Sequence, residues 1–296
     1  MSEKKDVDRR VMQLFDGYVH GQITRREFLD RVAAVTASGV AAAMLLKSLS
    51  PDYALAQQVD PDDKALSVSY KKYASPKGAG IMRGYYARPA VIQHKLPAVV
   101  VIHENRGLNP YIEDVSRRLG MAGFIAFAPD ALTPLGGYPG NDDDGRALQR
   151  QRDGAEMIED FVAAVQFLQQ HPDCTGKVGA VGFCFGGGMA MRLAVRMPDV
   201  AAAVAFYGRH PSADEAAAIQ APLMLHHAEL DERVNASWPD FEKGLKDAGR
   251  NFTNYDYAGV NHGFHNDTTP RYDKPAAELA WQRTVEFFTR HLELES

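Results

Sequence analysis

Residues 177–191 read KVGAVGFCFGGGMAM. They begin with a short apolar run, typical of a strand that is buried on both faces, and a run compatible with a helix starts after Gly186. Between the two, residues 182–186 fit the pattern Gly-x-nucleophile-x-Gly, a turn in which a Cβ at either glycine would clash with neighbouring backbone. The pattern predicts a strained strand-to-helix turn that holds Cys184 above one edge of a sheet.

Cys184 is therefore the candidate nucleophile. The positive end of the following helix and a nearby base would both favour its thiolate form. The alternative is that Cys184 is a small buried apolar residue, which is the commoner role of a lone cysteine. A phosphate-binding glycine loop is a poorer interpretation, because that motif needs a small residue at position 191, where this chain has Met191.

The composition indicates an ordinary globular protein. The 296 residues are 45% hydrophobic and 24% charged, which is enough for one large domain with a substantial core. The formal net charge is -5 and no basic stripe with interleaved aromatic residues occurs, so nucleic acid is not expected as a partner. The two cysteines, Cys174 and Cys184, form no paired framework, so the fold is not expected to depend on a disulfide.

Strand and helix patterns alternate along most of the chain. This alternation predicts an α/β fold with a mostly parallel central sheet and helices on both faces. An antiparallel edge hairpin is expected within residues 65–88. Further strands are expected at residues 98–102, 124–127, 178–181, 200–207, 222–227 and 252–257, and helices at 110–119, 158–168, 238–248 and 275–291. Ligands of such sheets bind at the carboxyl ends of the strands.

Residues 131–147 lack any period and are rich in Gly, Pro and Asp. A loop of this length in a compact domain predicts a functional segment, here a flap that covers the substrate. Three consecutive acidic residues at 142–144 fit no calcium loop, so a solvated acidic turn is expected rather than a metal site.

Candidate partners for Cys184 follow the two later strands. The segment AELDERV (228–234) supplies Asp231, and the segment GVNHGFH (259–265) supplies His262. The chain order nucleophile, acid, histidine is the α/β-hydrolase order, so Cys184, His262 and Asp231 are expected to act together. Alternatives remain open for each partner and for the neighbouring histidines: His265 as the base, Glu229 or Glu232 as the acid, and His226 and His227 as polar residues that close a strand rather than metal ligands.

Six segments together resemble the dienelactone hydrolase family of α/β-hydrolases, over residues 65–294. They are VVVIHENRGL, FIAFAPDAL, KVGAVGFCFGGG, AVAFYG, LDERV and NHGFH, in this order. The resemblance implies a triad of Cys184, His262 and Asp231, and a glutamate, Glu104, that contacts the resting thiol. It also implies an oxyanion hole formed by the amides of Asn105 and Phe185. No metal or organic cofactor is needed for such a reaction.

One position departs from the family pattern. Dienelactone-specific members place an arginine four residues after the catalytic histidine, to bind the substrate carboxylate, and this chain has Asn266 there. Because a neutral amide replaces a charge-assisted contact, neutral esters and lactones are expected to be better substrates than an anionic lactone. The expected substrate contacts are Arg106, Asn266 and Tyr207, with Arg146, Arg150 and Arg152 as further candidate cations.

Residues 1–56 resemble a twin-arginine export leader. They contain the segment TRREFL (24–29), an apolar run over residues 32–46, and Ala54-Leu55-Ala56 at the spacing that a signal peptidase recognises. The run is too short and too polar for a stable membrane span. The sequence thus predicts a periplasmic or exported protein, a partnership with the export machinery, and one hydrolase domain over residues 57–296. The alternative is a helix of a mature cytoplasmic protein.

These features predict a cysteine-dependent hydrolase of small esters or lactones that works through an acyl-enzyme. An alternative of a different class is a non-hydrolytic protein on the same fold, in which Cys184 senses redox state or binds a ligand. Such a protein would have no use for His262 with an orienting Asp231.

Overall fold

The computed structural model describes residues 9–36, 39–55 and 57–294. Within them, an eight-stranded sheet has the order β1-β2-β4-β3-β5-β6-β7-β8. The pairs β1–β2 and β2–β4 are antiparallel, and all other neighbours are parallel. The strands are β1 (Leu66–Ser75), β2 (Gly80–Pro89), β3 (Leu96–Ile102), β4 (Ile125–Pro129), β5 (Cys174–Phe183), β6 (Ala202–Phe206), β7 (Leu223–Ala228) and β8 (Phe252–Tyr257). The predicted α/β fold with an edge hairpin is confirmed.

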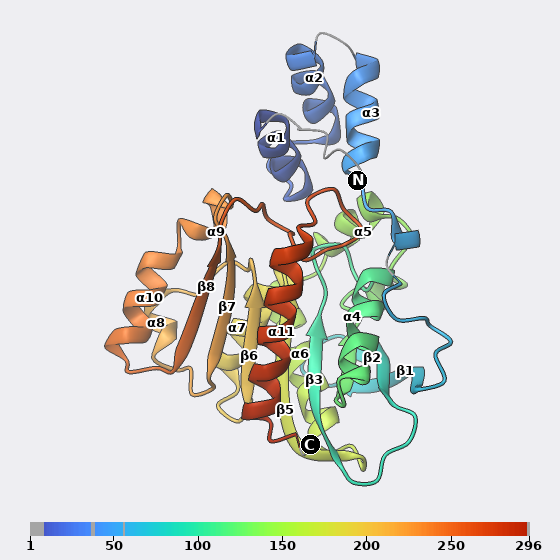
Figure 1. The fold of residues 1–296 in the computed structure, drawn as a ribbon, viewed down its shortest axis with the longest axis vertical. Coiled ribbons are helices and arrows are strands. Elements are labelled where there is room, and N and C mark those ends of the chain that lie inside the picture. Colours follow the sequence, from blue (N-terminus) through green and yellow to red (C-terminus); the bar gives the residue numbers. More distant parts are fainter. Residues whose placement is uncertain (1–8, 37–38, 56, 295–296) are drawn as a thin grey trace.

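Helices cover both faces of this sheet, as Figure 1 shows. Helices α4 (Pro110–Met121) and α11 (Lys274–His291) contribute to one buried apolar cluster. Helices α6 (Gly154–Gln169), α7 (Phe185–Arg196) and α10 (Trp238–Asp247) contribute to the other. The shorter elements are η1 (Tyr53–Leu55), η2 (Thr133–Leu135), α5 (Asp142–Gln149), α8 (Ala213–Ala216) and α9 (Glu232–Asn235).

Strand β3 explains why the sheet has two buried faces. All seven of its residues are buried. Val99 and Val101 belong to the cluster of α4 and α11, whereas Val100 and Ile102 belong to the cluster of α6 and α7. Successive side chains of a strand point to opposite faces, so a continuous apolar run is what a sheet covered on both sides requires.

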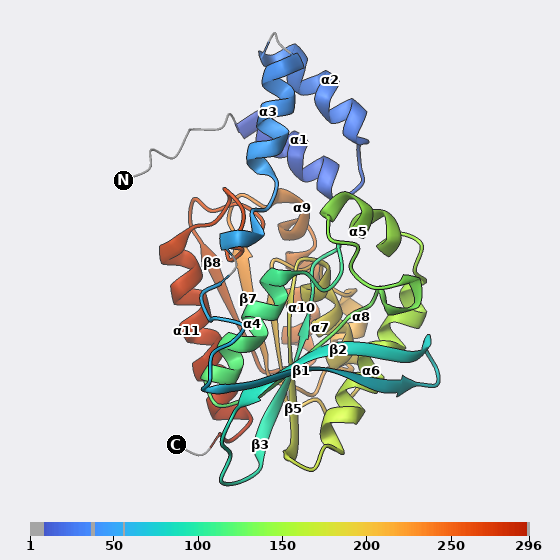
Figure 2. The ribbon, with the colours of Figure 1, turned by 90° about the vertical axis from the view of Figure 1, so that its right-hand side faces the viewer.

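Three helices from the start of the chain stand above the carboxyl end of the sheet (Figure 1). They are α1 (Arg9–Val19), α2 (Arg25–Thr36) and α3 (Gly39–Leu49), and we call them the helical cap. Figure 2 shows that the cap is separate from the two helical layers that flank the sheet. The cap has a small core of its own, formed by Val11, Phe15, Tyr18, Val19, Phe28, Val32, Ala42, Leu46 and Leu49.

The arginine pair of the predicted leader lies in the first turn of α2. Thr24 and Glu27 bracket it reciprocally: the Thr24 amide donates to Glu27 Oε2 at 2.7 Å, and the Glu27 amide donates to Thr24 Oγ1 at 3.2 Å. This is a capping box, which satisfies two amides that the helix leaves without an acceptor. The export leader stays a prediction, and cleavage after position 56 would remove the whole cap.

No single helix in the described part of the chain is both long enough and apolar enough to cross a membrane. Two consecutive segments, Arg25–Val35 and Gly39–Leu55, meet the length and composition requirements only when taken together, and they are bent by 120°.

The expected loop at residues 131–147 is irregular only in its first half. Asn141 caps helix α5 by accepting a hydrogen bond from the Asp144 amide at 2.9 Å. The acidic run 142–144 forms the first turn of that helix, where negative side chains are favourable. Asp143 and Asp144 are exposed as expected, whereas Asp142 pairs with Arg106 at 2.6 Å. The run belongs to a helix rather than a free turn, which the cap at Asn141 explains.

Candidate active site

Cys184 lies on the strained turn between β5 and α7. Its backbone has φ 57° and ψ -114°, a combination that side-chain-bearing residues rarely adopt. A Cβ on Gly182 would lie 1.9 Å from the carbonyl oxygen of Gly186, and a Cβ on Gly186 would lie 2.1 Å from that of Ile102. Only glycine fits at both positions, so the predicted turn and the reason for its two glycines are confirmed.

Asp231 and His262 meet at the carboxyl ends of β7 and β8. Asp231 Oδ2 lies 2.5 Å from His262 Nδ1, and both side chains are buried. The second Asp231 oxygen, Oδ1, accepts the amide of Val234 at 3.1 Å, which fixes the carboxylate. His262 is thus held with Nδ1 toward Asp231 and its other ring nitrogen free to face Cys184, whose Sγ lies within 4.8 Å of a ring nitrogen of His262.

The alternative acids and bases have other contacts. Glu229 accepts the amide of Gly259 at 2.7 Å. His265 bonds the Tyr111 hydroxyl at 2.6 Å, and burial pushes its pKa well below the ordinary value. His226 lies between the Tyr257 and Thr284 hydroxyls, at 2.9 and 3.1 Å. These side chains serve the packing of the domain, so they do not compete with His262 and Asp231.

Charge favours the thiolate form of Cys184. Burial raises the pKa of its thiol, but His262 and His20 outweigh burial, and the pKa lies well below the ordinary value. Burial lowers the pKa of His262, yet Asp231 and Cys184 raise it to about 10. The two shifts favour the same state, a Cys184 thiolate beside a His262 imidazolium.

The structure adds a residue that the sequence did not indicate. His20, at the end of α1, places Nε2 3.4 Å from Cys184 Sγ, and its ring packs 4.8 Å from the ring of His262. Asp16 Oδ1 lies 3.2 Å from His20 Nδ1, and Arg233 Nη2 lies 2.9 Å from His20 Nε2. His20 is 164 positions from Cys184 in a segment interpreted as a leader, so no local sequence signal could assign it to the site.

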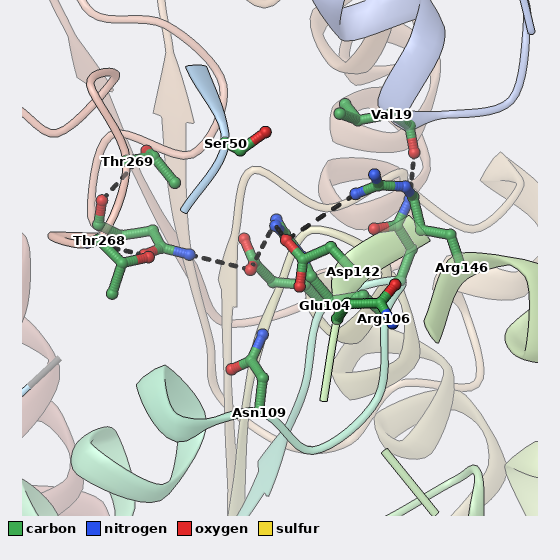
Figure 3. A network of polar contacts seen from close by, with 12 residues as sticks. Val19, Ser50, Glu104, Arg106, Asn109, Asp142, Arg146, Thr268 and Thr269 are labelled. Carbon is green, nitrogen blue, oxygen red and sulfur yellow. Dashed lines mark hydrogen bonds and ion pairs between the residues drawn. The ribbon is translucent and has the colours of Figure 1, made fainter. Parts of the chain in front are cut away.

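Glu104 does not contact the thiol, contrary to the expectation drawn from the family resemblance. Its Oε2 accepts hydrogen bonds from Arg106 Nη2 at 2.9 Å and from Asn266 Nδ2 at 3.0 Å, and no hydrogen bond joins Glu104 to Cys184 among the described residues. Figure 3 shows this network, in which Arg106 also bonds Asp142 Oδ2 at 2.6 Å. His20 holds the thiol contact that Glu104 was expected to make.

Arg106 and Asn266 were expected to bind substrate, but in the structure both side chains point toward Glu104 and bond its carboxylate. Both side chains are buried, and neither lines the cavity beside Cys184. Arg152 is also turned away, since it pairs with Asp160 at 2.7 Å. The loop after His262 turns the Asn266 side chain toward Glu104 instead of the cavity, so its expected contact with substrate stays a prediction that this geometry does not favour.

A cavity of about 390 Å³ opens beside Cys184. Tyr207, Asn105 and Phe185 line it, and Phe185 is the first residue of α7, whose amide has no acceptor within the helix. Five arginines also line it, and no acidic residue of the described chain does: Arg146, Arg150, Arg192, Arg209 and Arg233. Arg146 pairs with Asp143 and Arg233 with Asp16, so the unpaired positive charge at the cavity comes from the other three arginines.

His20, Cys184 and His262 bring three possible metal-ligand atoms within 4.8 Å of one another. Arg233 Nη2 lies 2.9 Å from one of those atoms, His20 Nε2. A guanidinium so close to the donor set repels a second cation, so the cluster suits proton transfer better than metal binding.

The sheet order, the strained turn after β5 and the placement of Cys184, Asp231 and His262 at strand ends define an α/β-hydrolase fold. A family model described as "Dienelactone hydrolase family" matches residues 82–292. The chain belongs to the dienelactone hydrolase family. A second model, described as "YqhI-like", matches residues 1–36, which contain α1 and α2 of the cap.

Individual relatives agree with this assignment. The chain is 59% identical over 109 residues to the "Putative hydrolase fragment YghX" of Escherichia coli, a match that covers 37% of this chain and 93% of that protein. It is 31% identical over 222 residues to a Bradyrhizobium protein named "Probable 2-oxo-3-(5-oxofuran-2-ylidene)propanoate lactonase", covering 70% of this chain and 89% of that one. The fold of this chain is similar to the crystal structure of the dienelactone hydrolase-like promiscuous phosphotriesterase P91, with a TM-score of 0.66 and 23% sequence identity. The match covers 77% of this chain and 99% of that one.

Proposed function

We propose that this protein hydrolyses small esters or lactones through an acyl-enzyme on Cys184. The observation that carries the proposal is the strained turn that holds the Cys184 thiol next to the buried pair of His262 and Asp231. A nucleophile, a base and a group that orients the base form one unit in acyl transfer. A redox sensor needs only the thiol, so the orienting carboxylate favours hydrolysis.

The proposed reaction begins with the Cys184 thiolate, which His262 stabilises as its imidazolium partner. Sγ attacks the carbonyl carbon, and the amides of Asn105 and Phe185 stabilise the charge that develops on the carbonyl oxygen. The carbon–oxygen bond of the ester then breaks, and the leaving alkoxide takes a proton from an imidazolium beside Sγ. Water hydrolyses the thioester with the help of a base beside Sγ, a role that sequence analysis assigned to His262.

The cavity favours anionic substrates, which reverses the expectation based on Asn266. Arg150, Arg192 and Arg209 are exposed at the cavity and have no ion pair within 4.0 Å among the described residues. Guanidinium groups recover the hydration that a carboxylate loses on entry. The named lactone of the Bradyrhizobium relative is a propanoate, an anion of the same class. We therefore propose carboxylate-bearing esters or lactones as the substrate class.

Removing one of the unpaired arginines of the cavity should weaken selectivity for anions. In Arg192→Ala and in Arg209→Ala, kcat/KM for an anionic lactone is expected to fall about tenfold, because one charge-assisted contact at an exposed site is lost. The value for a neutral lactone of matched size should hardly change. The loss should shrink at high salt.

Arg196→Ala is the matched control, since Arg196 lies on the same helix as Arg192 and pairs with Glu159 outside the cavity. Its kinetic constants should equal those of the wild type. If the wild type prefers the neutral lactone, the arginines do not anchor the substrate and this substrate class is wrong.

A further inference from the structure

Two Asp–His pairs flank Cys184, and they come from opposite ends of the chain. Asp231 and His262 follow β7 and β8, whereas Asp16 and His20 belong to the helical cap. We propose that His20, oriented by Asp16, is a second acid–base catalytic residue, which exchanges protons with substrate and water while His262 holds the thiolate. This inference rests on the proposed function, and it gives the cap a chemical role.

The cap pair is built like the hydrolase-domain pair. His20 Nδ1 lies 2.8 Å from the Asp16 carbonyl oxygen and 3.2 Å from its carboxylate, so this nitrogen is occupied and Nε2 points toward Cys184. Asp16 is fixed in turn by Arg233 at 3.4 Å and by Arg271 at 3.8 Å. Arg233 Nη2 lies 2.9 Å from His20 Nε2, and since a guanidinium only donates, this contact belongs to the neutral ring, whose Nε2 can act as a base. Burial lowers the pKa of His20, but Cys184 and Asp16 raise it above the ordinary value, so the same nitrogen can also hold a proton beside the thiolate.

The cap is docked by contacts that hold His20 in place. Asn105 Nδ2 donates to the Val19 carbonyl oxygen at 2.7 Å, next to His20 in the chain. Tyr18 bonds the Asp143 carboxylate, and the Arg146 guanidinium lies 5.3 Å from the Tyr18 ring centre. These contacts join the end of α1 to the loop after β3 and to helix α5. Residues of both segments line the cavity, so the same contacts that dock the cap also fix the position of His20.

The two histidines face different cavities. His20 lines the cavity of about 390 Å³ together with Cys184, Asn105 and Phe185. His262 and Asp231 instead line a second cavity of about 420 Å³, between the cap and the hydrolase domain. A substrate bound in the first cavity therefore has His20 beside its reacting atoms, whereas His262 does not line that cavity.

This placement divides the proton transfers. During deacylation, a water oxygen bonds to the thioester carbon, the carbon–sulfur bond breaks with its electron pair on Sγ, and His20 Nε2 takes the water proton. In the next acylation, Sγ attacks the ester carbon, the carbon–oxygen bond breaks, and His20 returns that proton to the leaving alkoxide. One ester and one water give one acid and one alcohol, and both histidines end each cycle as they began.

The variant His20→Ala distinguishes the role of His20 from that of His262. It is made in the full-length protein, and the N-terminal mass is measured first to verify that residue 20 is present. With a chromogenic ester, we expect kcat to fall about 100-fold, the usual contribution of one acid–base residue. Quenched samples should show the acyl-enzyme by intact mass, because deacylation is the impaired step. Added imidazole should speed turnover by entering the space that the side chain leaves. His262→Ala should behave differently, with slow acylation and no accumulated acyl-enzyme.

Met44→Ala, at a site 68% exposed on α3, is the control for changes in the cap and should match the wild type. Wild-type or faster turnover in His20→Ala would overturn the proposal and make the cap a mere cover. So would a loss of activity with neither acyl-enzyme accumulation nor imidazole rescue, because His20 would then only support the cap. Failure of the proposed function is distinguishable, since Cys184→Ala would then remain active.

Discussion

Cys184→Ala is expected to lower kcat for ester hydrolysis by about 10⁴-fold or more. The sulfur is the attacking atom in the proposed reaction, and Ala offers no nucleophile in its place. The side chain is small and only 7% exposed, so its loss should change the free energy of unfolding by about 1 kcal/mol and the melting temperature by a few degrees. Turnover of p-nitrophenyl acetate and thermal melting measure the two effects.

Cys174→Ala provides the matched control. Cys174 is the other cysteine, also buried, and it begins β5 at the end remote from the turn, where its sulfur contacts the Gly176 amide at 3.3 Å. This variant should keep wild-type turnover. If Cys184→Ala retains most of its activity in a well-folded state, Cys184 is not the nucleophile.

Removing His262 in addition to Cys184 should add little to the loss. His262→Ala alone is expected to reduce kcat by about 10³-fold or more, since the thiolate loses the imidazolium that lowers its pKa. In the double variant Cys184→Ala, His262→Ala, no thiolate remains to be stabilised. Residues that act as a unit are strongly non-additive in this way.

The comparison uses kcat/KM of the four proteins in one substrate series, with melting curves as the test of folding. The coupling free energy between Cys184 and His262 should nearly equal the whole loss of transition-state stabilisation caused by His262→Ala alone. If the two losses multiply, the residues act independently, and the unit of nucleophile and base proposed for this site is contradicted.

The sheet could be predicted from the sequence because its strands are buried on both faces. A continuous apolar run such as β3 can bury all of its side chains only in a sheet that is covered on both faces. The turn at Cys184 was equally predictable, since a Cβ on either of its two glycines would lie about 2 Å from a backbone oxygen. Both features depend on residues that are adjacent in the chain, so each leaves a recognisable pattern in the sequence.

The contacts of Glu104 and Asn266 could not be predicted in the same way. Their positions in the chain matched a family pattern, but the direction of each side chain depends on Arg106 and on how the loop after His262 folds. The arginines of the cavity come from α5, α7, α9 and the loops after α5 and β6, so they meet only in the folded protein.

The helical cap was not predicted, because the sequence around its second helix has two possible interpretations. The segment around Arg25 and Arg26 fits an export motif and also a capping box, and the sequence-based interpretation took the first. The capping signal, Thr24 followed by Glu27, was present and would have predicted a helix start. The approach of His20 to Cys184 leaves no trace in the sequence, because it depends on how the cap docks.

Intact-mass spectrometry of the protein during turnover tests the central claim most directly. The full-length chain is mixed with an excess of an activated ester, quenched in acid within milliseconds to seconds, and digested to locate any added mass. We expect an increase equal to the acyl group, carried by the peptide that contains Cys184 and absent from Cys184→Ala. An acyl group on another residue, or active hydrolysis with no covalent adduct at any time, would contradict the account.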